Sequence, residues 1–190
     1  MTWEGAGRQK QLQMIWPERL LDRPPRPELP EGYELRCYED TDESQYLQLM
    51  ARAGFDNWDH DRLERERPSI LSDGFFLVVH RATGKAVATA MAQHSPSELH
   101  PCGGVLGWVA GDPEHKGKRL GLAVCAAVVS RLVQAGYRRI YLQTDDGRLP
   151  AIKSYLKLGF EPFLFCEGMA ERWQKVCETL GWPRSPDAGQ

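Results

Sequence analysis

Alternation of apolar and polar residues predicts a series of short strands. In residues 33–38, Tyr33, Leu35 and Cys37 alternate with polar side chains, as in a strand with one buried face. Arg81 to Gly84 form a turn that joins two further strands into a hairpin. The remaining apolar runs are bounded by turn residues, and the predicted strands after the first are 75–79, 85–92, 105–111, 139–144 and 160–166.

Apolar positions at helical spacing predict helices between these strands. The first begins at Asp42 and ends at Gly54, and one face carries apolar residues at positions 46, 49, 50 and 53. Others are expected at 150–158, where Pro150 suits a first turn, and at 169–180, where Met169, Trp173, Val176 and Leu180 form one stripe. A heavily charged run, 58–67, is interpreted as the solvated face of one more helix.

The segment 120–135 is a helix of a different kind. It is apolar almost all round, so we expect it to be buried, with Gly136 at its end. The order of elements is then β-α-α-β-β-β-α-β-α-β-α. This order predicts an α/β domain with a central sheet, helices against it and a hairpin-rich first half.

The two ends of the chain differ from this pattern. Residues 1–32 contain five prolines within fourteen positions and are predicted to be an extended proline-rich arm, in which 11–16 is a candidate strand. The domain proper is expected at 33–166, followed by a C-terminal helix and tail at 167–190. The arm and that helix are candidate contacts for a homodimer.

Composition narrows the possible partners and setting. The net charge of −2 gives no global basic excess, so no nucleic-acid partner is predicted. No stretch approaches 18 apolar residues, so no membrane association is predicted. The five cysteines are widely spaced and form no C-x-x-C pair, which argues against a disulfide framework or a metal site. Residues 1–10 lack the apolar stretch of a secretory signal peptide, so a cytoplasmic location is expected.

The residues that suggest a binding function lie where a strand, a short basic loop and the buried helix 120–135 follow one another. The first N–H groups of a helix lack partners and carry the positive end of its dipole. Gly117 and Gly121 permit close approach to the backbone, and Lys116, Lys118 and Arg119 add positive charge. This combination predicts a cradle for a phosphate or pyrophosphate. The segment matches neither the P-loop motif G-x-x-x-x-G-K-S/T nor the dinucleotide-binding motif G-x-G-x-x-G. The alternative interpretation is a tight turn between strand and helix, with lysines that are only solvated.

Two sequence blocks resemble the GNAT superfamily of acyl-CoA-dependent N-acetyltransferases. The first is 109–121, and the second, 151–162, is similar to the family signature A-x-x-x-Y-x-K-x-G-F. The resemblance implies a mixed, mostly antiparallel sheet flanked by helices, with acetyl-CoA as co-substrate and no metal. It also implies direct transfer of an acetyl group to a primary amine, in a small molecule or a protein, within a ternary complex.

The same resemblance implies roles for particular residues. Tyr155 would protonate the leaving thiolate, and a phenol can supply that proton. Val109 and Gly111 would pair through their backbone with the amides of the pantetheine arm. The residues assigned to cofactor binding are Val109, Ala110, Gly111, Lys116, Gly117, Lys118, Arg119, Leu120, Gly121, Arg148 and Ser154.

The chain departs from the family pattern at several of these positions. Lys116 replaces a glutamine or arginine of the cradle, and Arg119 replaces its first glycine. Arg148 stands seven residues before the tyrosine, where asparagine is common. Gln143 occupies the position of the glutamate base that some relatives have, so the base is assigned to Asp145, the nearest carboxylate on that face. Asp146, a water-mediated route and an amine that is already neutral are alternatives.

Each assignment has a structural alternative. Tyr155 also fits the core of an amphipathic helix, and Asp145 and Asp146 also fit turn or helix-capping roles. For the whole chain, the alternatives to catalysis are an acyl-CoA-binding or regulatory module of the same fold and a structural domain without cofactor. The acceptor cannot be identified from the sequence, because acceptor sites in such enzymes are built from variable segments, here 42–74 and 93–103.

Overall fold

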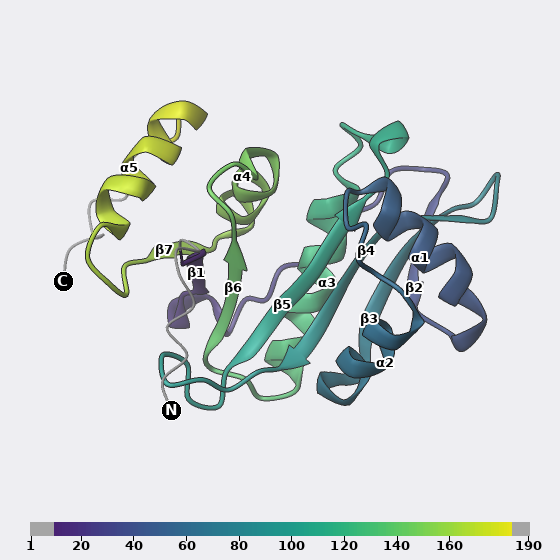
Figure 1. The fold of residues 1–190 in the computed structure, drawn as a ribbon, viewed down its shortest axis with the longest axis horizontal. Coiled ribbons are helices and arrows are strands. Elements are labelled where there is room, and N and C mark those ends of the chain that lie inside the picture. Colours follow the sequence, from purple (N-terminus) through teal and green to yellow (C-terminus); the bar gives the residue numbers. More distant parts are fainter. Residues whose placement is uncertain (1–9, 184–190) are drawn as a thin grey trace.

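A seven-stranded sheet forms the centre of the protein in the computed structural model, which describes residues 10–183 (Figure 1). The strand order is β2-β3-β4-β5-β6-β1-β7. The strands are β1 (Leu12–Trp16), β2 (Tyr33–Cys37), β3 (Ile70–His80), β4 (Lys85–His94), β5 (Gly104–Gly111), β6 (Ile140–Thr144) and β7 (Glu161–Phe163). The α-helices are α1 (Glu43–Arg52), α2 (His60–Glu66), α3 (Leu120–Gln134), α4 (Leu149–Leu158) and α5 (Met169–Leu180).

All neighbouring strands are antiparallel except β5 and β6, which run parallel. This confirms the predicted mixed, mostly antiparallel sheet. The parallel contact is short, because only Gly104 and Val105 pair with Ile140 and Tyr141. Beyond Val105 the two strands separate, so the edge of β5 that faces β6 has no further strand partner among the described residues.

The core has two parts, one on each face of the sheet. On one face, α3 and α4 pack on β-strand residues such as Val87 and Ala90, and α3 is buried along most of its length, as expected from its apolar sequence. On the other face, α1 and α2 cover Leu77 and Met91. Ala90 and Met91 are neighbours on β4 and enter opposite clusters, because side chains alternate between the faces of a sheet.

The position of β1 was not specified by the sequence pattern. β1 lies between β6 and β7 and is antiparallel to both, and Leu12, Met14 and Trp16 are buried in the core. Part of the predicted arm is therefore an interior strand of the sheet. The ring of Trp16 packs edge-on against Phe160 at 5.3 Å between centroids.

Other boundaries also differ from the sequence prediction. The hairpin strand expected at 75–79 extends over Ile70–His80, and the last strand shrinks from 160–166 to Glu161–Phe163. The helix at 169–180 forms as predicted and packs inward through Trp173 and Val176. Residues 1–9 of the predicted arm and 184–190 of the tail lie outside the described residues. Within residues 10–183, no helix is long and apolar enough to cross a membrane.

Candidate functional site

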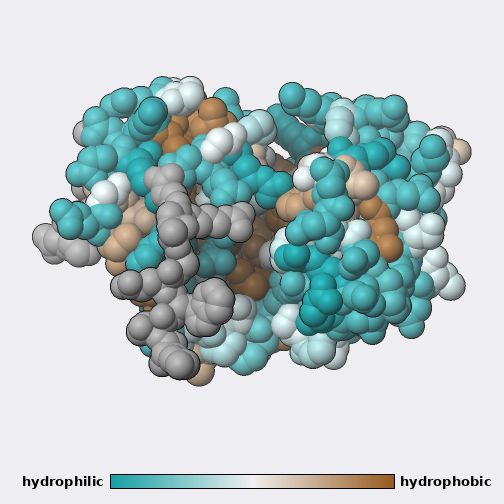
Figure 2. All heavy atoms as spheres, in the orientation of Figure 1, coloured by the Kyte–Doolittle hydropathy of each residue, from teal (hydrophilic) through white to brown (hydrophobic). Residues whose placement is uncertain are grey.

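A cleft of about 1040 Å³ opens where β5 and β6 separate. Its floor and one wall come from β4, β5, β6 and α4, and the facing wall comes from α2 and the α1–α2 loop. Figure 2 shows a hollow in the middle of the molecule with an apolar interior between polar walls. The residues that carry polar groups into the cleft are Gln11, Asn57, Arg62, Arg65, Glu66, Ser69, Gln93, Ser95, Tyr141, Gln143, Asp145, Arg148 and Tyr155.

A bulge in the β4–β5 pair shapes the floor of the cleft. Thr89 pairs with Ala110 and Met91 pairs with Gly107, so Trp108 and Val109 together oppose the single residue Ala90. Trp108 adopts φ +51°, a left-handed conformation that is rare for a bulky side chain. The ladder is interrupted at this point, so the predicted cofactor residue Val109 lies both at a bulge and in the lining of the cleft.

The predicted cradle lies beyond the C-terminal end of β5, at the start of α3. None of the backbone N–H groups of residues 117–122 donates to an acceptor within the described residues. A Cβ atom added at Gly117 or Gly121 would meet no atom within 4 Å, so the space in front of these glycines is open. Free N–H groups at a helix start, facing open space, suit an anion. The cleft lining includes Val109 but not the residues of this cradle.

The cradle is strained at one position. Arg119 precedes the first turn of α3 and has φ +60°, ψ +18°, and Gly117 has φ +86°. The left-handed conformation costs an L-residue about 1–2 kcal/mol but costs glycine little. Arg119 stands where the family pattern has a glycine. Its backbone adopts the left-handed conformation that glycine would adopt at little cost.

Buried and hydrogen-bonded groups hold the loop before the cradle. Asp112 is buried, accepts from the backbone N–H of Glu114 at 3.0 Å and pairs with Arg52 Nε at 2.8 Å. Lys118 Nζ donates to the hydroxyl of Tyr33 at 2.6 Å, and that hydroxyl lies 2.8 Å from His115 Nδ1. The charge of Lys118 is thus anchored to β2. Burial, together with Lys118, lowers the pKa of His115.

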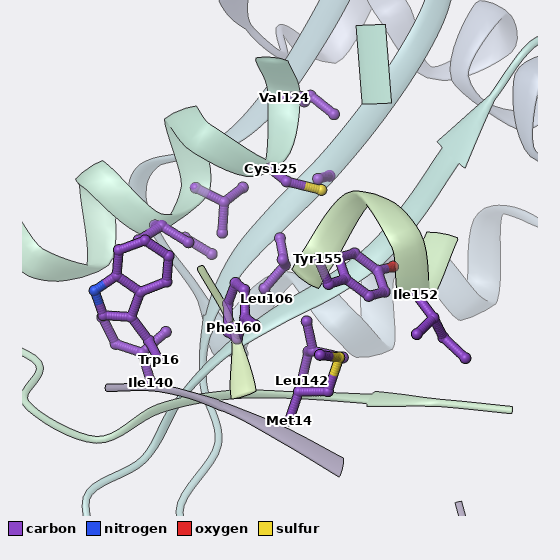
Figure 3. Close-up of a cluster of buried hydrophobic side chains, with 14 of the residues drawn as sticks. Met14, Trp16, Leu106, Val124, Cys125, Ile140, Leu142, Ile152, Tyr155 and Phe160 are labelled. Carbon is purple, nitrogen blue, oxygen red and sulfur yellow. The ribbon is translucent and has the colours of Figure 1, made fainter. Parts of the chain in front are cut away.

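Tyr155 brings a hydroxyl from the core to the cleft. The ring packs beside Phe160 and Cys125, and Figure 3 shows the hydroxyl pointing away from Phe160 and Trp16. The side chain lines the cleft, and no described residue hydrogen-bonds to its hydroxyl. Burial raises the pKa of Tyr155 far above its ordinary value, while Arg148 opposes that shift. The phenol therefore stays protonated at neutral pH, as a proton donor must.

Asp145 also lines the cleft, and it is held by the residue just before β1. Gln11 Nε2 donates to Asp145 Oδ1 at 3.0 Å. Asp146 lies outside the cleft lining and forms an ion pair with Arg172 of α5, which lowers the pKa of Asp146. Neither carboxylate caps α4, whose N-cap is Arg148 with no side-chain cap, so the capping interpretation is wrong.

Arg148 and Ser154 occupy different environments. The guanidinium of Arg148 stacks over Phe55 at 4.5 Å, which places it across the cleft against the α1–α2 loop. The hydroxyl of Ser154 donates within its own helix to the carbonyl of Pro150 at 3.0 Å, and Ser154 is not part of the cleft lining. Of the two, only Arg148 faces the cleft.

The sequence pattern did not predict that residues of the charged run 58–67 line the cleft. Arg62, Arg65 and Glu66 of this run, and Ser69 just after it, line the cleft, although the run was interpreted as a solvated face. Glu66 accepts from the buried amide of Gln93 at 2.8 Å, and the same amide nitrogen lies 2.8 Å from Ser69 Oγ. The spacing i, i+3, i+4, i+7 places these residues on one helical face, and it is the signal that could have found them.

Metal-ligand residues do not gather in the described part of the chain. No group of three or more His, Cys, Asp or Glu side chains there could hold a metal ion. His100 is fully buried, stacks on Tyr141 and accepts from Arg139 Nε at 2.9 Å through Nδ1. Its Nε2 lies 2.6 Å from Gln13 Oε1, so the imidazole belongs to a structural network.

A model of the "Acetyltransferase (GNAT) family" matches residues 31–160, which is most of the chain. The chain belongs to the GNAT acetyltransferase family. Among curated GNAT relatives it is 35% identical over 147 residues to a mycothiol acetyltransferase of Thermobispora bispora, covering 72% of this chain and 49% of that protein. It is 33% identical over 171 residues to the mycothiol acetyltransferase of Saccharomonospora viridis, covering 83% and 55%. The chain thus spans about half the length of these relatives.

Solved structures of N-acetyltransferases share the fold. A GCN5-related N-acetyltransferase from Sphaerobacter thermophilus aligns with a TM-score of 0.62 at 23% identity, over 83% of this chain and 50% of that one. The ribosomal-protein-S18-alanine N-acetyltransferase of Escherichia coli aligns with a TM-score of 0.56 at 21% identity, over 70% and 79%. At these identities the likeness concerns the arrangement of strands and helices.

Proposed function

We propose that this GNAT protein transfers an acetyl group from acetyl-CoA to a primary amine, directly and within a ternary complex. The observation that carries the proposal is the Tyr155 hydroxyl, which has no hydrogen-bond partner among residues 10–183 and lies in the cleft beside the edge of β5 that no described strand pairs with. The curated relatives are named for acetyl transfer, which supports the reaction class. Since the chain spans about half of each, the acceptor is a separate question.

The residues present fit acetyl-CoA. The free N–H groups of 117–122 and the cations of Lys116, Lys118 and Arg119 suit the pyrophosphate. The unpaired edge of β5, from Leu106 to Gly111, can hydrogen-bond the pantetheine amides as an added strand would. Acetyl-CoA supplies an activated thioester, and the chain has to orient the amine, take up one proton and give another.

The proton balance assigns two roles. The amine nitrogen forms a C–N bond to the acetyl carbon, the C–S bond breaks, the amine loses one proton and the thiolate gains one. In our proposal Tyr155 donates the proton to the sulfur, because burial keeps its phenol protonated. Asp145 takes the proton from the amine, because it is a carboxylate in the lining of the cleft, oriented by Gln11.

Binding of acyl-CoA without catalysis is the second candidate. Three observations favour it: Arg119 in place of the cradle glycine, Gln143 in place of a glutamate base, and Arg148 in place of asparagine. Gln143 is exposed on β6 and lies opposite Gln13 of β1, so no carboxylate replaces it at that position. The two candidates share the cofactor site and differ in whether thiol is released.

The decisive experiment combines binding and thiol release on the same preparation. Isothermal titration with CoA and acetyl-CoA measures occupation of the cradle, and a thiol-reactive dye measures CoA release with a panel of amines. We expect amine-dependent release together with acetylated product by mass spectrometry. Tight binding with no release on any amine would favour the binding module, and absence of binding at millimolar acetyl-CoA would contradict both.

A further inference from the structure

The arginine and carboxylate side chains that line the cleft do not pair with one another. Arg62, Arg65 and Arg148 line it, and none of them forms an ion pair with a described residue. The two cleft carboxylates are held by neutral amides instead: Glu66 by Gln93 at 2.8 Å and Asp145 by Gln11 at 3.0 Å. The cleft therefore presents guanidinium groups that form no ion pair with a carboxylate of the described chain.

Two aromatic rings hold the side chain of Arg62, and its Nε has no hydrogen-bond acceptor among the described residues. Its guanidinium lies 4.7 Å from the ring of Trp108 and 5.6 Å from the ring of Trp58. Its Nε is buried and has no hydrogen-bond partner in the described residues. A buried N–H without an acceptor costs free energy, and an oxygen atom of a ligand in the cleft would offset that cost. Stacking holds the plane of the group and leaves its edge available.

Arg65 stands one helical turn after Arg62 on the same cleft-facing side of α2. Asn57 and Ser69 line the cleft at either end of this helix and add neutral polar groups. Two guanidinium groups side by side recognise planar or tetrahedral anions through paired N–H donors. Tyr155 and Asp145 belong to the opposite wall, on α4 and the end of β6.

We propose that the acceptor amine carries an anionic group, a carboxylate or a phosphate, which Arg62 and Arg65 bind on α2 while the amine faces Asp145 and Tyr155. This rests on the proposed acetyl transfer and defines the class of its acceptor. An amine with a neutral substituent would leave both guanidinium groups without a counter-ion when the cleft fills. Amino-acid-like and phosphorylated amines share the required chemistry and are separated by the test.

The first arm of the test measures binding without turnover. Protein saturated with CoA, so that the cradle is filled, is titrated with inorganic phosphate and separately with glutarate, and the Arg62 Nε–Hε resonance is followed by NMR. We expect a saturable shift, weakened at least fivefold by Arg65→Gln. Arg138→Gln, at an exposed arginine outside the cleft, serves as the matched control and should leave the titration unchanged. The absence of a saturable shift, or equal affinity in Arg65→Gln, would overturn the inference.

The second arm measures acceptor preference. Amines are compared in pairs that differ only in charge, namely amino acids against their carboxamides and phosphoethanolamine against ethanolamine. We expect kcat/KM to favour the anionic member at least tenfold, and Arg65→Gln to remove most of that preference. Equal use of both members overturns the inference while acetyl transfer itself stands. If no amine is acetylated, the proposed function fails, and the NMR titration still decides whether the arginines bind an anion.

Discussion

The amide nitrogen of Gln11, the residue just before β1, donates to Asp145 Oδ1 at 3.0 Å, and so joins the start of the described chain to a carboxylate in the cleft. The contact leaves the second carboxylate oxygen without a described partner, available to an amine.

The first prediction concerns the base. Asp145→Asn should lower kcat about 100-fold near pH 7, because an amide cannot accept the amine proton, with little change in KM for acetyl-CoA. The loss should shrink as pH rises and more of the amine is already neutral. Glu66→Gln is the matched isosteric change at the other cleft carboxylate and should cost far less. The reverse ranking in steady-state kinetics would assign the base to Glu66.

The second prediction concerns the acid. Tyr155→Phe should lower kcat at least about 100-fold and leave acetyl-CoA binding nearly intact, because only the proton donor is removed. The free energy of unfolding should change by less than about 1 kcal/mol, since no described residue hydrogen-bonds to the hydroxyl.

Tyr46→Phe is the control for that change. Tyr46 is fully buried on the opposite face of the sheet, and its hydroxyl has no described partner. Its removal should leave kcat unchanged. Full activity in Tyr155→Phe would remove the tyrosine from the mechanism.

The third prediction separates strain from charge in the cradle. Arg119→Ala and Arg119→Gly both remove the guanidinium, so both should weaken CoA binding, with a reduced dependence on salt. Only glycine relaxes the left-handed backbone, so the glycine variant should be more stable to denaturant by about 1 kcal/mol than the alanine variant. Equal stability of the two variants would show that the φ of +60° costs nothing.

The fourth prediction concerns acid stability. Burial, together with nearby Arg139, lowers the pKa of His100 to about 4, whereas an unfolded histidine has a pKa of about 6.5. The unfolded state then binds more protons between these values, so the contribution to stability is full above pH 6.5 and is lost as pH falls toward 4. His100→Gln should flatten the loss of unfolding free energy over this window by about 2–3 kcal/mol.

His60 provides the opposite case. It is exposed and hydrogen-bonds to Glu43, which raises its pKa, so its contribution is present below pH 6.5 and is lost above it. His60→Gln should therefore leave the slope between pH 4 and 6.5 as it is in the parent protein. Denaturant titrations at a series of pH values would measure both variants.

Local pattern predicted the elements better than their pairing. Leucine and valine on every side of α3 specify a buried helix wherever it packs, and its bounds agree closely with the structure. The sequence offers 11–16 as a candidate strand but does not identify its neighbours, because pairing depends on which edges remain open after the rest of the sheet forms. The interior position of β1 was therefore beyond sequence reasoning.

The sequence predicted the part of the site that is built from backbone N–H groups in a local motif. It did not predict contacts between side chains that are far apart in the sequence. Gly117 and the start of α3 follow from glycine placement and from the unpaired N–H groups of any helix. Glu66 lay in a run whose charge suggested solvent, and only the position of α2 over β5 gives it a cleft to face. Its partner Gln93 comes from another strand, and no local spacing relates the two.

The position of β1 between β6 and β7 has a consequence for how the protein is made. Its partners on β6 lie roughly 130 residues later, and β7 pairs with no other described strand. During synthesis the segment with Leu12, Met14 and Trp16 must stay unpaired until β6 and β7 have emerged. A chain that starts at residue 31, where the family match begins, would lack this strand and leave β7 without a partner. We expect such a truncation to aggregate during expression, although the family core is complete in its sequence.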